Sequence, residues 1–456
     1  MRVSTILAAL SATSLVAAHP GLSRRQDEVS DTPAAPEPTE LPEVPETPEE
    51  PEVTEPAEPE PTEPAEPAEP VGPSPFEGRK LYANPDWSDK LEETYAAFEA
   101  AGDEKNAARV RTIQDIGTFV WITTRAGLAG IDTAIERARA IQEETGEDHI
   151  VGLVLYNLPD RDCSGLESGG ELSSDENGLE IYKEEFIKPY AEKVGAASDL
   201  TFAIVLEPDS LGNAITNSAI EFCANATPLY EEGIAFAISE LQFDHVHLYI
   251  DAAHGGWLGW QDNLEPTAKE FAKVLALAGE GKRIRGFATN VSNYNPFNAT
   301  VRENYTEYSP SWDENHYALS LAPFLEAEGL PSQFIIDQGR VALPGAREEW
   351  GEWCNVAPAG FGAAPGSSTG NNTHIDSLVW IKPGGESDGE CGMEGAPRAG
   401  AWFDEYVQML VENAEPSLFG EEPAEPAPEE PAPEEPTPEE PAPEEPAPEE
   451  PAPEEP

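Results

Sequence analysis

Residues 150–158 read IVGLVLYNL and residues 202–207 read FAIVLE, and these two runs decide the fold. Short apolar runs rich in Val, Ile and Leu are typical of strands buried on both faces of a parallel sheet. Further runs of this kind occupy residues 119–123, 246–252, 284–289, 334–337 and 378–382. Helical patterns lie between most of them, at residues 130–144, 180–194, 226–241 and 265–278. Strands that alternate with helices in seven or so units predict an α/β fold, a parallel β/α barrel.

The chain has 456 residues and a formal net charge of −62, from 26 basic and 88 acidic side chains. Such a charge disfavours nucleic acid and anionic membranes as partners. Residues 26–70 hold 16 acidic and no basic residues, and residues 421–456 hold 15 and none. We expect the Pro/Glu-rich segments 26–75 and 421–456 to be disordered, because proline removes backbone donors while glutamates repel one another. Residues 76–420 are left as the folded domain.

The start of the chain predicts secretion to the extracellular space. Residues 1–18 combine a positive start, a short apolar stretch and small residues before a cut, which is the pattern of a signal peptide. The arginine pair at positions 24 and 25 suggests a second cut, so residues 19–25 are interpreted as a propeptide. No later stretch approaches the length of a membrane span.

Four cysteines agree with an oxidising compartment, and they are Cys163, Cys223, Cys354 and Cys391. They allow three pairings, of which 163 with 223 and 354 with 391 is preferred because it closes two moderate loops. No pair has the spacing of zinc ligands, and we expect a monomer without a metal ion or cofactor. Five sequons are candidate glycosylation sites, at Asn225, Asn290, Asn298, Asn304 and Asn371. Asn290 follows an apolar run directly, so burial is expected to block its modification.

Polar and aromatic residues follow the predicted strands, at the face where barrel enzymes place their active sites. The carboxylates are Asp162, Asp209, Asp251, Glu386 and Asp388, and the tryptophans are Trp121, Trp257, Trp260, Trp350 and Trp353. Aromatic faces stack on pyranose rings, while carboxylates, Lys382 and Arg340 can hydrogen bond hydroxyls. Carboxylate pairs also hydrolyse glycosidic bonds. The sequence therefore predicts a site for a sugar polymer.

Two longer motifs resemble the signatures of glycoside hydrolase family 6. They are VLYNLPDRDC at residues 154–163 and IVLEPDSL at residues 204–211. The segments 251–260, 290–295, 350–354 and 382–388 are also similar to that family, so the resemblance covers roughly residues 80–418. It implies a distorted seven-stranded, TIM-like barrel that hydrolyses β-1,4-glucan, cellulose, with inversion at the anomeric carbon. It also supports the preferred disulfide pairing.

The resemblance implies roles for individual residues. Asp209 would be the general acid, and Asp162 beside it would keep its proton affinity high. Asp388 matches the position usually proposed for the general base, and the alternative is a water activated through Ser168 and Asp162. Tyr156 would press on the distorted sugar ring. Substrate-contacting positions match Trp121, Thr123, Asn217, Asp251, His254, Trp257, Trp260, Asn293, Arg340, Trp353, Lys382 and Glu386.

The sequence departs from the family pattern at three places. Thr123 stands where relatives often have an aspartate, and Glu167 stands where they usually have a small residue. Two loops roof the active site in this family. The first, residues 163–178, has its full length here, whereas the second, residues 388–402, is short. We therefore expect a partly open tunnel and a cellobiohydrolase that releases cellobiose from non-reducing chain ends.

Three alternatives remain at this stage. The first is an endo-β-1,4-glucanase with an open cleft. The second is a non-catalytic carbohydrate-binding protein on the same barrel, which is disfavoured because Asp162, Asp209 and Asp388 are all retained. The third is an acidic matrix protein whose function lies in the Pro/Glu-rich segments. Those segments contain no aromatic residue or cysteine, so no attached cellulose-binding module is expected.

Overall fold

The computed structural model describes residues 72–421, and within them parallel strands form one eight-stranded sheet. The predicted signal peptide and propeptide, and nearly all of the two Pro/Glu-rich segments, lie outside the described residues. The strands are β1 (Lys80–Leu81), β2 (Val120–Ile122), β3 (His149–Leu155), β4 (Thr201–Leu206), β5 (Val246–Asp251), β6 (Gly286–Thr289), β7 (Phe334–Asp337) and β8 (Ile375–Val379). From β3 to β8 each strand pairs with the next along the chain, and β1 and β2 share the free edge of β3.

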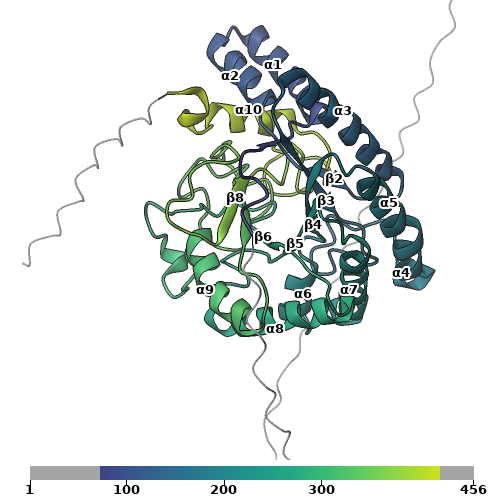
Figure 1. Ribbon diagram of the computed structural model, residues 1–456. Helices are drawn as coiled ribbons and strands as arrows, with labels where there is room; N and C mark the ends of the chain where they lie inside the picture. The colour runs from purple at the N-terminus through teal and green to yellow at the C-terminus, as the bar shows by residue number, and fades with distance from the viewer. Residues whose placement is uncertain (1–71, 422–456) are drawn as a thin grey trace, which may run out of the picture. The chain divides into compact units, whose positions relative to one another are not determined.

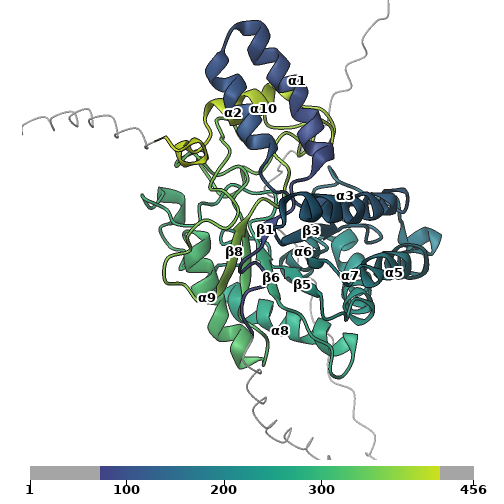
Figure 2. The same cartoon turned by 45° about the horizontal axis from the view of Figure 1, so that its top comes forward.

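Helices cover the outside of this sheet (Figure 1). They are α1 (Pro85–Ala101), α2 (Glu104–Gln114), α3 (Ala129–Thr145), α4 (Gly178–Ile181), α5 (Lys188–Ala196), α6 (Ser210–Thr216), α7 (Glu221–Glu240), α8 (Gln261–Ala278), α9 (Glu314–Ala327) and α10 (Asp404–Glu412). Helices α1 and α2 form a hairpin that packs beside α10 (Figure 2). No helix among the described residues is both long and apolar enough to cross a bilayer.

The strands β2 to β8 curl into a nearly closed, seven-stranded barrel, which confirms the fold predicted from the sequence. No ladder joins β2 to β8 within residues 72–421; a seam takes its place. At this seam the Phe119 amide donates to the Trp380 carbonyl at 3.0 Å, and the Trp121 indole donates to the Ile381 carbonyl at 2.9 Å. Phe119 packs so closely on β3 that a Cβ atom at Gly152 would lie 2.6 Å from its ring.

Alternation along β3 divides its side chains between two apolar cores. Val151, Leu153 and Leu155 belong to the core beneath the helices, whereas Ile150 and Val154 belong to the core inside the barrel. Every residue of β3 is buried. This explains why the strand appears in the sequence as an unbroken apolar run rather than as an alternating one.

The last strand differs from the prediction. The sequence predicts it at residues 378–382, but the strand spans Ile375–Val379. Residues 380–382 lie beyond the end of the strand. The cause is the carboxylate of Asp337 at the end of β7, which accepts the Ile381 amide at 3.1 Å and the Lys382 amide at 2.9 Å. The Asp337 side chain thus takes the hydrogen bonds that a neighbouring strand would otherwise make. The chain leaves the sheet at this point, at the carboxyl ends of the strands.

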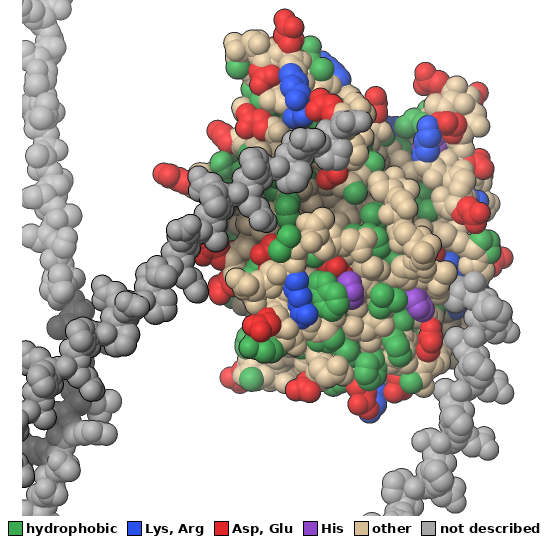
Figure 3. Space-filling model, turned by 90° about the vertical axis from the view of Figure 1, so that its left-hand side faces the viewer, with side chains coloured by type: hydrophobic (Ala, Val, Ile, Leu, Met, Phe, Trp, Pro, Cys, Tyr) green, Lys and Arg blue, Asp and Glu red, His purple; other side chains and the backbone are tan. Residues whose placement is uncertain are grey.

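The structure shows which of the five predicted glycosylation sites are accessible. Asn290 is fully buried and its amide donates to the carbonyls of Asn295 and Asp337, so this sequon is not accessible for glycosylation. The other four sequons have exposed asparagines. Figure 3 shows one face of the molecule, with Asp and Glu side chains along its rim and few Lys and Arg.

Candidate active site

The carboxyl ends of the strands open into a cleft of about 1230 Å³. Most of the predicted site residues line it: Trp121, Thr123, Tyr156, Asp162, Ser168, Asp209, Asn217, His254, Trp257, Trp260, Asn293, Trp353, Lys382, Glu386 and Asp388. They come from the ends of β2 to β6 and from the loops after β7 and β8. The barrel therefore brings together side chains that are more than 250 residues apart in the sequence.

Asp209 follows β4 in a left-handed backbone conformation, with φ of 67°. Aspartate tolerates this conformation better than most side chains, although it still stores strain. Two neighbours hold it there. The buried carboxylate of Glu207 accepts the Asn157 amide at 3.0 Å and the Tyr182 hydroxyl at 2.9 Å, which fixes the end of β4. The backbone amide of Asp209 itself donates to Asp251 Oδ2 at 2.9 Å.

The electrostatic surroundings make Asp209 a proton donor. Burial, together with the negative charges of Asp251 and Asp162, raises the pKa of Asp209 well above its usual range. Burial also raises the pKa of Asp251 to about 7. A carboxyl group in this position stays protonated in mildly acidic solution and can give its proton to an oxygen in the cleft.

Asp162 lies in a chain of hydroxyl groups. The backbone amide and the hydroxyl of Ser168 both donate to Asp162 Oδ2, at 2.7 and 3.1 Å, and Tyr156 Oη lies 2.8 Å from Ser168 Oγ. Burial raises the pKa of Tyr156 well above its usual range, so its hydroxyl remains protonated. The Tyr156 ring is held between Trp121, edge-on at 5.5 Å, and the guanidinium of Arg161 at 4.3 Å.

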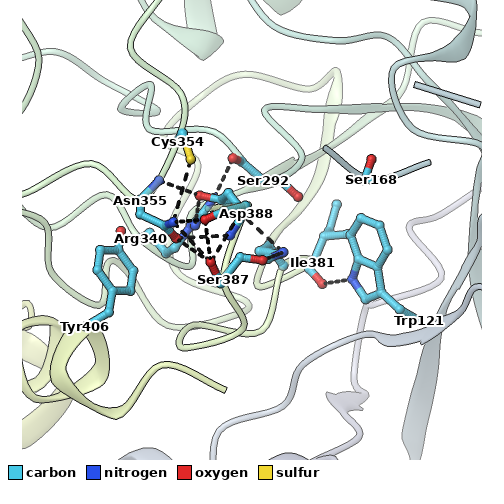
Figure 4. A network of polar contacts seen from close by, with 12 residues as sticks. Trp121, Ser168, Ser292, Arg340, Cys354, Asn355, Ile381, Ser387, Asp388 and Tyr406 are labelled. Atoms are coloured by element: carbon cyan, nitrogen blue, oxygen red, sulfur yellow. Dashed lines mark hydrogen bonds and ion pairs between the residues drawn. The ribbon is translucent and has the colours of Figure 1, made fainter. Parts of the chain in front are cut away.

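Asp388 is surrounded by hydrogen-bond donors (Figure 4). Its Oδ2 atom accepts Arg340 Nη1 at 2.7 Å, the Asn355 amide at 2.9 Å and the Tyr294 hydroxyl at 3.2 Å. Lys382 Nζ lies 3.5 Å from Oδ1. Burial alone would raise the pKa of Asp388, but the charges of Arg340 and Lys382 outweigh it and lower the pKa. Asp388 is therefore an ionised carboxylate with most of its acceptor capacity in use.

Hydrogen bonds fix the orientation of the aromatic and polar walls. The indole of Trp257 donates to Thr216 Oγ1 at 2.7 Å, and that of Trp260 donates to the Gly256 carbonyl at 2.9 Å. Trp353 is 40% exposed, which leaves its face open to a ligand. Rigid aromatic faces of this kind suit the stacking of sugar rings.

Both disulfides of the preferred pairing are present, Cys163–Cys223 and Cys354–Cys391. Each anchors one of the loops beside the cleft. The second loop folds back on itself, because the Ser387 amide donates to the Ala401 carbonyl at 2.9 Å and the Gly400 amide returns to Ser387.

The two loops contact each other beside the cleft. Glu167 of the first loop packs against Gly389 of the second so closely that a Cβ atom on the glycine would lie 2.7 Å from Glu167 Oε2. The departure of Glu167 from the family pattern is therefore part of this contact.

Two of the predicted substrate-contacting residues do not line the cleft. Asp251 and Arg340 are each only 2% exposed and do not line the cleft. Asp251 lies behind Asp209, where its Oδ2 accepts backbone amides, and Arg340 lies beneath Asp388. In this structure, Asp251 contacts the backbone of Asp209, and Arg340 contacts the carboxylate of Asp388. Asp251 ends β5 and Arg340 follows β7, so the sequence predicts that both lie at the carboxyl-end face of the barrel. It does not predict that their side chains are buried behind the cleft.

Some lining residues were not identified from the sequence. Helix α1 contributes Asp86 and Lys90, its N-cap residue is Asn84, and the short second loop contributes Arg398. Lys90 Nζ pairs with Glu386 Oε1 at 2.7 Å. None of these residues lies in one of the motifs or after one of the strands predicted from the sequence. Residues 72–421 contain no grouping of three His, Cys, Asp or Glu side chains suited to a metal ion.

The family model "Glycosyl hydrolases family 6" matches residues 76–414. The chain belongs to this family. It is therefore a glycoside hydrolase, and the resemblance carried by the two motifs is confirmed. The match spans the whole barrel, from the segment before β1 to the end of α10.

Relatives within glycosyl hydrolase family 6 include both cellobiohydrolases and endoglucanases. A 1,4-beta-D-glucan cellobiohydrolase of Podospora anserina is 65% identical over 350 residues, which is 76% of this chain and 83% of the relative. The solved structure of an endoglucanase from Humicola insolens is 55% identical, with a TM-score of 0.74 over 76% of this chain and 99% of that one. A cellobiohydrolase II from Humicola insolens, solved with glucose and cellotetraose, is 36% identical, with a TM-score of 0.70 over 75% and 98%.

Proposed function

We propose that this chain is a secreted, inverting cellulase that hydrolyses β-1,4-glucosidic bonds. The observation that carries the proposal is the pairing of two unlike carboxyl groups in one cleft: Asp209, with its pKa raised, and Asp388, with its pKa lowered. Environments that push the pKa values of two carboxyl groups apart are typical of glycoside hydrolysis. The named activities of the relatives support β-1,4-glucan as the substrate.

In the proposed reaction Asp209 donates its proton to the glycosidic oxygen while the bond from that oxygen to the anomeric carbon breaks. A water molecule attacks the anomeric carbon from the opposite face and gives its proton to a base. We assign this second proton to Asp162, reached through Ser168. The hydrogen bonds from Ser168 to Asp162 Oδ2 support that route.

Asp388 has a different part in this proposal. Its low pKa and its three hydrogen bonds to Oδ2 make it a weak proton acceptor. Its fixed negative charge would instead stabilise the positive charge that develops on the sugar ring. Tyr156, held between Trp121 and Arg161, would press on the ring that is distorted before cleavage.

We further propose the cellobiohydrolase mode, in which cellobiose is released from non-reducing chain ends through a partly open tunnel. The packing of Glu167 on Gly389 supports it, because it joins the two loops beside the cleft. The 65% identity to a cellobiohydrolase also supports it. The alternative, an endoglucanase, is favoured by the shortness of the second loop and by the 55% identity to an endoglucanase.

The test is to follow cellohexaose hydrolysis by proton NMR and to determine the lengths of the first products. We expect the new reducing end to appear as the α-anomer, with cellobiose as the main product. A β-anomer would refute inversion, and α-anomers spread over several lengths would favour the endoglucanase.

Substitution tests the acid assignment separately. The variant Asp209→Asn should bind cellohexaose without cleaving it, whereas Asp244→Asn, at a fully exposed position, should keep full activity. Turnover that survives in the Asp209→Asn variant would refute the role of Asp209. Secretion is supported by the two disulfides, which require an oxidising compartment, and is tested by assaying activity in the culture medium of the producing cells.

A further inference from the structure

Arg347 is a buried arginine beside the cleft that has no role in the proposed reaction. It is 5% exposed, and within residues 72–421 it makes no ion pair. Its two terminal nitrogens reach two amide oxygens instead: Nη1 donates to Asn293 Oδ1 at 2.8 Å, and Nη2 donates to Asn295 Oδ1. Burial lowers the pKa of Arg347, because a charge is less well solvated there than in water. The guanidinium therefore fixes the orientation of two asparagine side chains.

The first group that it organises is the side chain of Asn293. Asn293 Oδ1 accepts both Arg347 Nη1 and the Tyr294 amide, the latter at 2.7 Å. Because the oxygen is occupied by two donors, the amide of Asn293 cannot flip. Its nitrogen is left as the free end of a side chain that lines the cleft. Asn293 is thus presented to a ligand as a hydrogen-bond donor.

The second group is His254, which Arg347 reaches through Asn295. With its oxygen held by Arg347, Asn295 directs its nitrogen to Glu314 Oε1 at 2.5 Å and toward His254 Nδ1 at 3.4 Å. The Gly256 amide also donates to His254 Nδ1 at 3.2 Å. The Nδ1 atom is therefore an acceptor, and the proton of the neutral ring lies on Nε2.

The charge state of His254 agrees with this arrangement. Burial, with the nearby charge of Arg347, lowers the pKa of His254 to about 3, so the ring is neutral at any working pH. Trp350 completes the wall. Its ring lies 5.8 Å from the Arg347 guanidinium and packs on Gly256, where a Cβ atom would come within 2.0 Å of it.

We propose that Arg347 is a positioning residue that makes this wall of the cleft a set of hydrogen-bond donors. Asn293 Nδ2 and His254 Nε2 then both meet oxygen lone pairs, which suits the hydroxyl and acetal oxygens of a glucan chain. This inference rests on the proposed function, which places the glucan in this cleft. It adds that substrate binding on this wall depends on a residue that the glucan does not touch.

The experiment compares steady-state kinetics on cellopentaose for four variants of the full chain. Arg347→Met removes the fork. Arg285→Met is the matched control, because Arg285 is also a largely buried arginine but pairs with Asp376, away from the cleft. Asn293→Asp keeps an oxygen for Arg347 and removes the donor. The fourth variant combines Arg347→Met with Asn293→Asp.

We expect Arg347→Met to raise KM roughly tenfold with kcat changed less than about twofold, the effect of one lost binding contact. Asn293→Asp should raise KM to a similar degree, and the double variant should add little, because both changes remove the same donor. Arg285→Met should lower the melting temperature and leave KM unchanged.

Two results would overturn the inference in an active enzyme. One is an Arg347→Met variant that loses thermal stability but keeps the wild-type KM. The other is a double variant whose KM is the product of the two single effects, since independent effects would mean that Arg347 does not act through Asn293. A wild-type chain that neither binds nor cleaves cellopentaose would instead refute the proposed function, and the inference with it.

Discussion

Glu207 offers a direct test of how burial at the end of β4 sets the response of this enzyme to pH. Its carboxylate is fully buried and accepts the amides of Asn157 and Leu158 and the hydroxyl of Tyr182. Burial outweighs these donors and raises the pKa of Glu207 from 4.5 to about 7. The group lies two residues before Asp209, so the same carboxylate supports both the strand end and the proposed acid.

The sign of the effect follows from the direction of this pKa shift. The folded state holds the proton more tightly than the unfolded state does. The stability linked to Glu207 is therefore fully present below about pH 4.5 and is lost as the pH rises through 7. A shift of this size, from 4.5 to about 7, corresponds to about 3 kcal/mol of unfolding free energy. We therefore expect Glu207→Gln, which cannot ionise, to reduce the loss of stability between pH 4 and pH 8 by about 3 kcal/mol.

The assay is urea unfolding of the wild type and of Glu207→Gln at the two pH values. The glutamine also disturbs the hydrogen bonds of Asn157 and Leu158, which costs about the same at both pH values and cancels in the comparison. Glu144→Gln, at an exposed position on α3, is the matched control and should follow the wild type. Equal losses of stability in Glu207→Gln and the wild type would refute the reasoning.

Three further predictions follow from the site. Asp251→Asn removes a carboxylate behind Asp209 and so lowers the pKa of Asp209; the alkaline limb of the kcat/KM profile should move to lower pH, and an unmoved limb would contradict this. Gly256→Ala places a methyl group 2.0 Å from Trp350. We expect KM for cellopentaose to rise several-fold and the free energy of unfolding to fall by about 1–3 kcal/mol. Wild-type values of both quantities would argue against the close packing. Reducing the disulfide that closes residues 354–391 should remove about 3–4 kcal/mol of stability in the chain-entropy account, seen as a lower melting temperature; an unchanged melting temperature in reductant would be inconsistent with it.

The barrel could be predicted from the sequence because each central strand is buried on both faces. After His149, strand β3 has no polar residue to interrupt its apolar run, so its position is evident from the sequence. The end of β8 was misplaced for a physical reason. Trp380 and Ile381 are as apolar as a strand, but the carboxylate of Asp337 takes the amides that would continue the ladder. Competition between a side chain and a strand leaves no periodic signal.

Helix α1 was not predicted, although a signal for it exists. Its buried residues Trp87, Leu91, Thr94 and Phe98 recur at intervals of three and four, which is the period of an amphipathic helix. The pattern stands outside the alternation of strands and helices that led to the barrel. Because this helix also supplies residues that line the cleft, its periodic pattern bears on the site as well as on the fold.

The candidate site was predictable where it lies in motifs and not where it depends on depth. Asp162, Asp209 and Asp388 follow strands and do line the cleft. Asp251 ends its strand in the same way, but its carboxylate is turned beneath Asp209. Arg347 has no motif around it, and its importance is visible only once the barrel places its guanidinium between two asparagines. One sequence gives residue types at strand ends, and the fold decides which of them reach a ligand.

The seam between β2 and β8 gives this barrel a mechanical property. A fully closed barrel resists a change of diameter all round, because widening it would break a continuous ladder. In this barrel the ladder is interrupted at the seam. There the Phe119 amide and the Trp121 indole donate hydrogen bonds to the chain after β8. The seam runs directly below Trp121 and Lys382, which face each other across it with Lys382 Nζ 5.7 Å from the indole ring. A glucan that stacks on Trp121, as the proposed function has it, would therefore contact both sides of the seam at once.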